Sequence, residues 1–104
     1  MSQILRLRDC SGRFLTRTEG EAIRERLFKI LDSLGEEDQL TIDFTGVDVM
    51  TPSFADESLG KFAEKVNRIN FRNRISLIDA PATIRALVNS ILTEHIPPDE
   101  RKTT

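Results

Sequence analysis

Apolar residues recur in the segment TRTEGEAIRERLFKILDSLG at alternating steps of four and three, the spacing of one face of an α-helix. This stripe consists of Ile23, Leu27, Ile30 and Leu34. Thr18 and Glu21 have the spacing of a capping box, in which a hydroxyl and a carboxylate satisfy the first free backbone N–H groups. Gly35 tolerates the left-handed conformation with which many helices end. We therefore expect a helix capped at Thr18 and terminated at Gly35.

The same rhythm returns twice in the second half of the chain. From Ser53 onward the apolar positions are Ala55, Leu59, Phe62, Val66 and Ile69. After Pro81, which suits the first turn of a helix, they are Ile84, Leu87, Val88 and Ile91. The pattern predicts a second amphipathic helix from Ser53 and a third one from Pro81. Two glycines, Gly20 and Gly60, lie inside the ends of predicted helices.

Short stretches between the helical segments alternate apolar and polar residues, as strands do. QLTIDF places its apolar residues on one face and Thr41 and Asp43 on the other, so we expect helices to cover only one side of this strand. RISLID is a further strand. Two runs around the Cys-Ser-Gly break at residues 10–12 predict an N-terminal β-hairpin. The predicted fold is an α/β sandwich of one mixed β-sheet, made of the hairpin and parallel strands, with about three helices.

Length and composition favour one soluble, cytoplasmic domain. The chain has 104 residues, enough for a single core, and we expect a domain over residues 1–95 and a flexible tail over residues 96–104. A single cysteine excludes an intrachain disulfide, which suits the cytoplasm. No apolar run approaches the roughly 20 residues that span a bilayer. The N-terminus also lacks the apolar core of a secretory signal, so no membrane partner is expected.

Residues suited to catalysis are scarce. His95 is the only histidine and Cys10 the only cysteine, and they are far apart in the sequence, which predicts no pair of nucleophile and base. We interpret His95, near the end of the third predicted helix, as a surface residue or a cation at the helix C-terminus. The glycine-rich phosphate-binding motifs are missing, and the carboxylates lack a metal-ligand spacing. We expect no enzyme activity, no cofactor and no metal site.

The balance of charge argues against a general attraction to nucleic acid. The chain has 15 basic and 17 acidic residues, a formal charge of -2. Its arginines form two groups: Arg6, Arg8, Arg13 and Arg17, and then Arg68, Arg72 and Arg74. A basic binding surface would require both groups to lie on one face; otherwise they are solvated at strand edges and helix ends. The chain has no tryptophan or tyrosine, so a stacking platform for single strands is not expected.

The segment DFTGVDVMTPSFADESLG, residues 43–60, passes from a strand through a turn directly into a helix. Pro52 presets the first helical turn and biases Thr51 toward an extended conformation. Thr51 and Ser53 both suit the N-cap, where a hydroxyl accepts a backbone N–H and contributes about 1 kcal/mol. One hydroxyl can serve as the cap while the other lies exposed beside the start of the helix. The sequence leaves open whether both are structural caps or one is a regulatory site.

This segment resembles the central part of STAS domains, the fold of the anti-sigma factor antagonists. In that fold an aspartate-ended strand and a short loop lead to a serine that starts the next helix. The order of predicted elements over residues 3–92 agrees. A more specific resemblance is to a bacterial STAS-like family of unknown function, which has an Asp-Phe-x-Gly-Val strand end followed by Pro-Ser-Phe-Ala-Asp. The matching residues here are Asp43, Phe44, Gly46, Val47, Pro52, Ser53, Phe54, Ala55 and Asp56.

The resemblance to the antagonists implies a site and a partner. Their serine at the position of Ser53 is phosphorylated by a kinase with a histidine-kinase-like ATPase fold, and the phosphate controls partner binding. Carried to this chain, Ser53 is the candidate phosphosite. The candidate partner surface consists of Asp48, Thr51, Pro52, Phe54, Asp56 and Glu57. The antagonists usually have an aspartate at the position of Thr51 and a glycine at that of Phe54, so the fold transfers more directly than the switch.

We therefore expect a non-catalytic regulatory domain that binds another protein and is switched by phosphorylation at the strand–helix turn. One alternative is a nucleic-acid-associated or mobile-element regulator that uses the arginine groups. Another is a STAS variant that binds a small ligand. An exposed edge strand of the sheet would also allow a homodimer.

Overall fold

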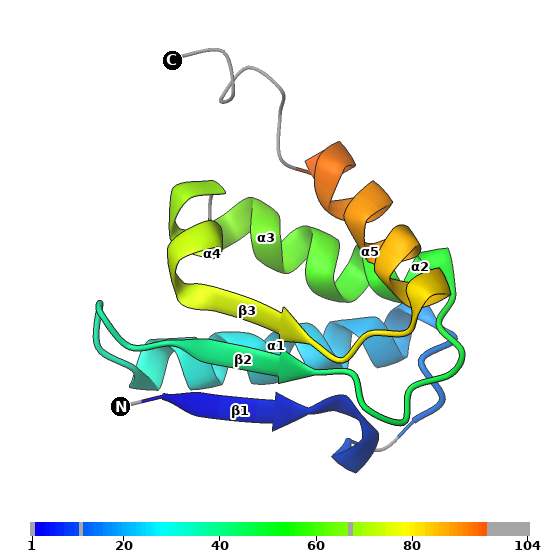
Figure 1. Ribbon diagram of the computed structural model, residues 1–104, viewed down its shortest axis with the longest axis horizontal. Helices are drawn as coiled ribbons and strands as arrows, with labels where there is room; N and C mark the ends of the chain where they lie inside the picture. The colour runs from blue at the N-terminus through cyan, green and yellow to red at the C-terminus, as the bar shows by residue number, and fades with distance from the viewer. Residues whose placement is uncertain (1, 11, 67, 96–104) are drawn as a thin grey trace.

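Strands and helices alternate along the chain in a computed structural model that describes residues 2–10, 12–66 and 68–95, the side chains of 68–70 excepted (Figure 1). The strands are β1 (Gln3–Arg6), β2 (Leu40–Asp43) and β3 (Ile75–Ile78). They form one sheet in the order β1-β2-β3, and both pairings are parallel. The expected α/β class is confirmed. The tail expected over residues 96–104 lies outside the described residues.

The N-terminal hairpin expected from the sequence is wrong. β1 pairs in parallel with β2, with Gln3 opposite Leu40. The chain then turns away in the short 3-10 helix η1 (Leu7–Asp9), which lets the side chains of Leu7 and Cys10 enter the core. Phe14 has a φ of 63°, a left-handed conformation outside the range of regular strands. The sheet of the described residues is therefore parallel throughout and not mixed.

The helices follow the expected apolar stripes. α1 spans Arg17–Ser33 and α5 spans Ala82–His95. Between β2 and β3, a continuous helical run consists of α2 (Pro52–Ala55), the π-helical segment η2 (Asp56–Gly60) and α3 (Lys61–Val66), and α4 (Arg68–Arg74) precedes β3. Because the strand order never reverses, right-handed crossovers place the connecting helices on the same face of the sheet. Figure 1 shows α1 behind the sheet on that face.

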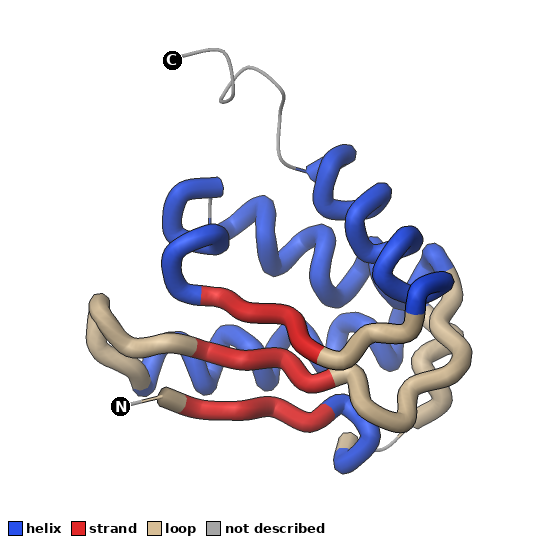
Figure 2. The backbone as a smooth tube through the Cα atoms, viewed as in Figure 1, coloured by secondary structure: helices blue, strands red, loops and turns tan. Residues whose placement is uncertain are grey.

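One face of the sheet is buried and the other is open, as the alternation in QLTIDF predicts. The side chains that face the helices are buried; they include Leu5, Leu40, Ile42 and Ile75. On the opposite face Ile4 is 50% and Ile78 is 38% exposed. Figure 2 shows the strands as a single layer, with loops that connect their carboxyl ends to α2 and α5.

The capping box of α1 lies two residues earlier than expected. Thr16, and not Thr18, is the N-cap, because its hydroxyl accepts the backbone N–H of Glu19 at 3.1 Å and the Glu19 carboxylate accepts the N–H of Thr16 at 3.0 Å. The same carboxylate accepts the backbone N–H groups of Arg13 and Leu15. These bonds, that of Arg13 first, lower the pKa of Glu19 to about 2. Glu19 therefore organises the whole turn before α1.

Candidate functional site

The candidate site lies at the carboxyl end of β2, in the turn that leads to α2. Asp43 ends the strand and accepts hydrogen bonds from the backbone N–H and the hydroxyl of Thr45, at 2.9 and 2.7 Å. The backbone N–H of Val47 donates to the carbonyl of Phe44, which closes a turn whose third residue is Gly46. Gly46 has a φ of 82°, which favours glycine. The Asp-Phe-x-Gly-Val pattern thus encodes the shape of this turn.

Thr51 is the N-cap of α2. Its hydroxyl accepts the backbone N–H of Phe54 at 3.1 Å and donates to the carbonyl of Leu15 at 2.7 Å. The backbone N–H of Thr51 donates to the carbonyl of Phe14 at 3.1 Å. Thr51 therefore starts α2 and also ties it to the segment before α1. The competition between Thr51 and Ser53 for the cap is decided in favour of Thr51.

Ser53 is the second residue of α2 and is partly exposed. Within the described residues its side chain makes no hydrogen bond. The next side chain, Phe54, is only 1% exposed, and its ring packs edge-on against that of Phe14 with centroids 5.4 Å apart. The bulky ring at this position therefore points into the core, while the Ser53 hydroxyl remains at the surface.

The six residues of the expected partner surface are not equally accessible. Asp48 and Pro52 are exposed, and Thr51 and Asp56 are partly exposed. Phe54 and Glu57 are buried, so their inclusion in an exposed surface is wrong. Two apolar side chains near the turn were missed: Val49 is 60% and Leu15 is 37% exposed. Both residues lie outside the periodic apolar stripes, so the sequence pattern did not indicate that they would be exposed.

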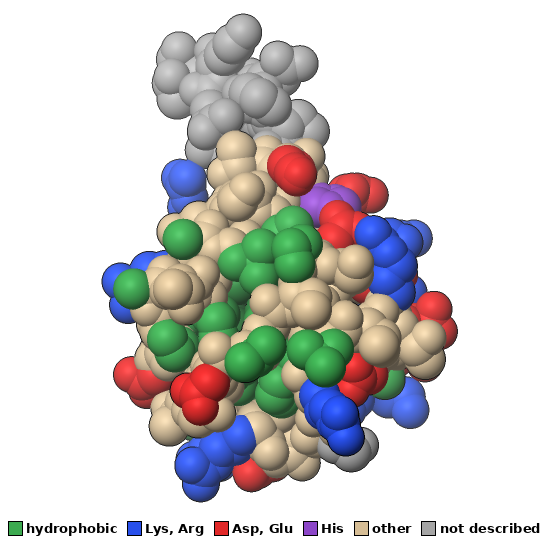
Figure 3. Space-filling view, turned by 90° about the vertical axis from the view of Figure 1, so that its right-hand side faces the viewer, with side chains coloured by type: hydrophobic (Ala, Val, Ile, Leu, Met, Phe, Trp, Pro, Cys, Tyr) green, Lys and Arg blue, Asp and Glu red, His purple; other side chains and the backbone are tan. Residues whose placement is uncertain are grey.

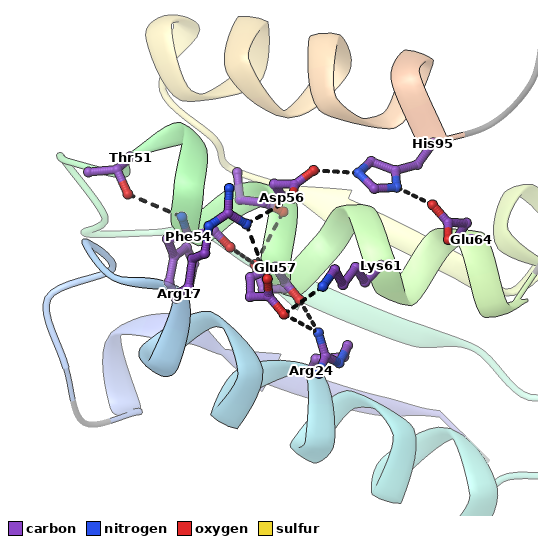
Figure 4. A network of polar contacts seen from close by, with 11 residues as sticks. Arg17, Arg24, Thr51, Phe54, Asp56, Glu57, Lys61, Glu64 and His95 are labelled. Carbon is purple, nitrogen blue, oxygen red and sulfur yellow. Dashed lines mark hydrogen bonds and ion pairs between the residues drawn. The ribbon is translucent and has the colours of Figure 1, made fainter.

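A group of ionic contacts joins α1, η2 and α3 next to the turn (Figure 4). The buried carboxylate of Glu57 lies 2.8 Å from Arg24, 3.0 Å from Lys61 and 3.1 Å from Arg17. Hydrogen bonds from Arg24, Lys61 and Arg17 outweigh desolvation and lower the pKa of Glu57 to about 2. Glu57 therefore stays charged and connects the first helix to the helical run after the turn.

His95 binds two carboxylates at the end of α5. Its Nε2 lies 2.5 Å from Asp56 and its Nδ1 lies 2.5 Å from Glu64. Both ring nitrogens donate only when the imidazole is charged. Burial alone lowers the pKa of His95, but the hydrogen bonds to Asp56 and Glu64 outweigh it, and the net pKa is raised. The helix-end position was expected, whereas its partners, more than 30 residues away, left no local pattern.

Asp56 links His95 to the turn. Besides His95, its carboxylate binds Nη1 of Arg17 at 3.0 Å. The pKa of Asp56 is lowered mainly by the hydrogen bond from His95 and to a smaller extent by the one from Arg17. One carboxylate, three positions after Ser53, therefore connects the ends of α1 and α5.

Members of the two arginine groups lie at opposite ends of the sheet. Arg6 and Arg8 lie at the carboxyl end of β1, whereas Arg74 directly precedes β3 and so lies at the opposite end of this parallel sheet. Arg17 is bound to Asp56 and Glu57. The described residues therefore give no support to the nucleic-acid-binding alternative, which required both arginine groups to lie on one face. The described residues also contain no group of three or more His, Cys, Asp or Glu side chains that could hold a metal ion.

The parallel sheet and the capped turn together define a STAS-like α/β domain. A family model described as a STAS-like domain of unknown function matches residues 19–85. The match covers more than half of the chain, and the protein belongs to this family. No curated protein and no solved structure matches the chain. Among the described residues, every helix is too short or too polar to cross a membrane.

Proposed function

We propose that this chain is a regulatory domain that binds a partner protein around Ser53, and that phosphorylation of Ser53 switches this binding. The supporting observation is the different use of two neighbouring hydroxyls. Thr51 caps α2, whereas the side chain of Ser53 makes no hydrogen bond within the described residues and stays partly exposed. A hydroxyl that the fold does not need is free to be modified.

The turn is suited to carry a phosphate without unfolding. A phosphoserine adds about -1.5 to -2 charges. At the start of a helical run such a charge is favoured by about 0.3–1 kcal/mol. The neighbours of Ser53 at i+3 and i+4 are Asp56 and Glu57, and Arg17 binds both carboxylates, which compensates part of their charge. The cap at Thr51 is also unaffected, so the modification changes the surface and not the fold.

The partner contact is expected on the exposed side chains beside the phosphate. Asp48, Val49, Pro52 and Leu15 supply a mixed polar and apolar surface around the turn. A partner that docks here without an arginine opposite Ser53 would have to bury an unpaired dianion, which weakens the complex. The resemblance to the anti-sigma factor antagonists makes a serine kinase with a histidine-kinase-like ATPase fold our proposed partner. We place the domain in the cytoplasm, where a free buried thiol such as Cys10 stays reduced.

The test begins with a pull-down from the native cell, in which mass spectrometry identifies the partner and any phosphate on Ser53. The partner is then titrated calorimetrically with the wild type, Ser53→Ala, Ser53→Asp and the matched control Ser90→Asp, which changes an exposed serine on α5. We expect Ser53→Asp to fold and to lose at least about tenfold in affinity, since burial of an unpaired charge is costly. Ser53→Ala and Ser90→Asp should bind like the wild type. Equal affinity of Ser53→Asp and the wild type would refute the switch.

A further inference from the structure

A cavity of about 210 Å³ opens at the carboxyl ends of β2 and β3, beside α5. It is lined by Phe44, Leu77, Ala80, Arg85, Val88 and Asn89. Phe44 and Val88 are buried and form an apolar floor. Figure 3, which shows the side of the molecule with the strand ends and α5, has apolar side chains gathered in its centre. The cavity lies outside the polar contacts described above.

The mouth of the cavity carries an unneutralised cation. Arg85 and Asn89 are four residues apart on α5, so their side chains lie next to one another on the helix surface. Within the described residues the guanidinium of Arg85 has no carboxylate at ion-pair distance, and it donates only one long hydrogen bond, 3.4 Å, to the carbonyl of Ala80. Arg17 and Arg24, by contrast, are bound to carboxylates. Arg85 therefore has hydrogen-bond donors to offer a ligand.

The lining defines one class of ligand. A single guanidinium balances one negative charge, and a planar carboxylate matches its fork of N–H donors. The apolar floor requires a ligand whose main part is apolar. The ligand must also be small, because the volume of the cavity is below the roughly 300–1,000 Å³ of sites for drug-sized ligands. We propose that this cavity binds a small aliphatic monocarboxylate, whose chain contacts Phe44 and Val88 and whose carboxylate binds Arg85. A nucleotide has more charge than one arginine neutralises.

This site does not depend on Ser53, and its test is separate from that of the proposed function. Straight-chain monocarboxylates from butanoate to decanoate, and the alcohols of the same length, are titrated into the full chain and followed by calorimetry and by NMR shifts of Val88. We expect the affinity to rise about fourfold for each methylene group until the cavity is full, and then to level off. The alcohols should bind at least about tenfold more weakly, because a neutral hydroxyl replaces the charged, bidentate partner of Arg85.

Two variants and one control locate the site. Arg85→Gln should reduce carboxylate binding to the level of the alcohols, while Arg72→Gln, at an exposed arginine of α4, should have no effect. Val88→Phe should fill the floor of the cavity and abolish binding of both the carboxylates and the alcohols. If circular dichroism shows that Val88→Phe does not fold, Ala80→Leu is used in its place. No saturable binding to the wild type at millimolar concentration would overturn the proposal. Binding that is unchanged in Arg85→Gln, or that increases with chain length without a plateau, would overturn it as well.

Discussion

The imidazole of His95 lies directly against Gly60. A Cβ atom at Gly60 would come within 2.6 Å of both Nε2 and Cδ2 of the ring and 2.9 Å of Ile91. Glycine weakens a helix interior by about 1 kcal/mol relative to alanine, so its place in η2 has a packing reason. It opens the space through which His95 reaches Asp56 and Glu64.

Gly60→Ala should therefore destabilise the protein, although alanine is the better helix former. We expect a loss of about 1–3 kcal/mol in the free energy of unfolding, the usual cost of overpacking, measured by urea denaturation. Gly35→Ala is the matched control, because a Cβ atom there would meet only the flexible carboxylate of Asp38 at 3.2 Å. If Gly60→Ala is as stable as the wild type, the ring does not occupy this space in solution.

The anchoring of α5 should weaken as the pH rises. Burial lowers the pKa of His95, but the hydrogen bonds to Asp56 and Glu64 outweigh it, so the pKa in the folded state is raised above its ordinary 6.5. A raised folded pKa gives stability that is complete below the unfolded value of about 6.5 and is lost as the pH rises through the folded value.

Urea denaturation of the wild type and of His95→Gln between about pH 5.5 and 9 measures this contribution, because glutamine does not titrate there. The wild type should exceed the variant in stability most at the acid end, and the difference should decline toward the alkaline end. A difference that is constant over the whole range would show that His95 acts through packing and not through its charge.

The two hydroxyls of the turn should contribute differently to stability. Thr51→Ala removes the N-cap of α2 and the hydrogen bond to Leu15, and we expect a loss of about 1–2 kcal/mol. Ser53→Ala removes no hydrogen bond within the described residues and should stay within about 0.5 kcal/mol of the wild type. Thermal and urea unfolding compare the two. The reverse order would assign the cap to Ser53 and remove the basis for a free phosphosite.

Glu57 should contribute to stability at neutral pH and lose this contribution in acid. Its folded pKa is about 2, mainly through Arg24, whereas the ordinary value is 4.5. A lowered folded pKa gives stability that is present above the unfolded value and lost as the pH falls toward the folded one. Glu57→Gln should therefore be clearly less stable than the wild type at pH 7, and the difference should shrink toward pH 3.

The control for Glu57 is Glu25→Gln, at an exposed carboxylate of α1 with no ion pair within the described residues. It should change the stability little at either pH, as surface substitutions do. If Glu57→Gln changes the stability as little as this control does, the negative charge of Glu57 does not hold Arg17, Arg24 and Lys61 together.

Elements that depend on local periodicity could be predicted from the sequence, and their ends could not. The apolar stripes identified α1 and α5 because a buried helix face needs one apolar residue per turn. The cap of α1 was misplaced because Thr16 and Thr18 both precede a glutamate by three residues, and only the bonds of Glu19 to Arg13 and Leu15 distinguish them. The false hairpin arose because burial of Leu7 and Cys10 outweighs the alternation of the first residues.

The site was accessible to sequence reasoning only where it is local. Thr51 and Ser53 lie within one turn, so their competition for the cap was visible. The contacts of Glu57 and His95 join helices far apart in the chain, and charge alone does not specify such pairs. Glycines inside the predicted helices were a further sign of close packing between helices. A Cβ atom at Gly20 would come within 2.8 Å of the carbonyl of Phe54, which shows how closely α1 packs on the helical run after the turn.

A sheet without a hairpin has a consequence for how the protein is made. Gln3 pairs with Leu40, and Leu40 with Ile75, so a whole helix is synthesised between any two neighbouring strands. At roughly 5–20 residues per second, β1 leaves the ribosome some seconds before its partner exists. Helices form locally and early, whereas these distant pairings must close long loops. The nascent chain therefore carries an unpaired strand edge until β3, in the last third of the domain, has emerged.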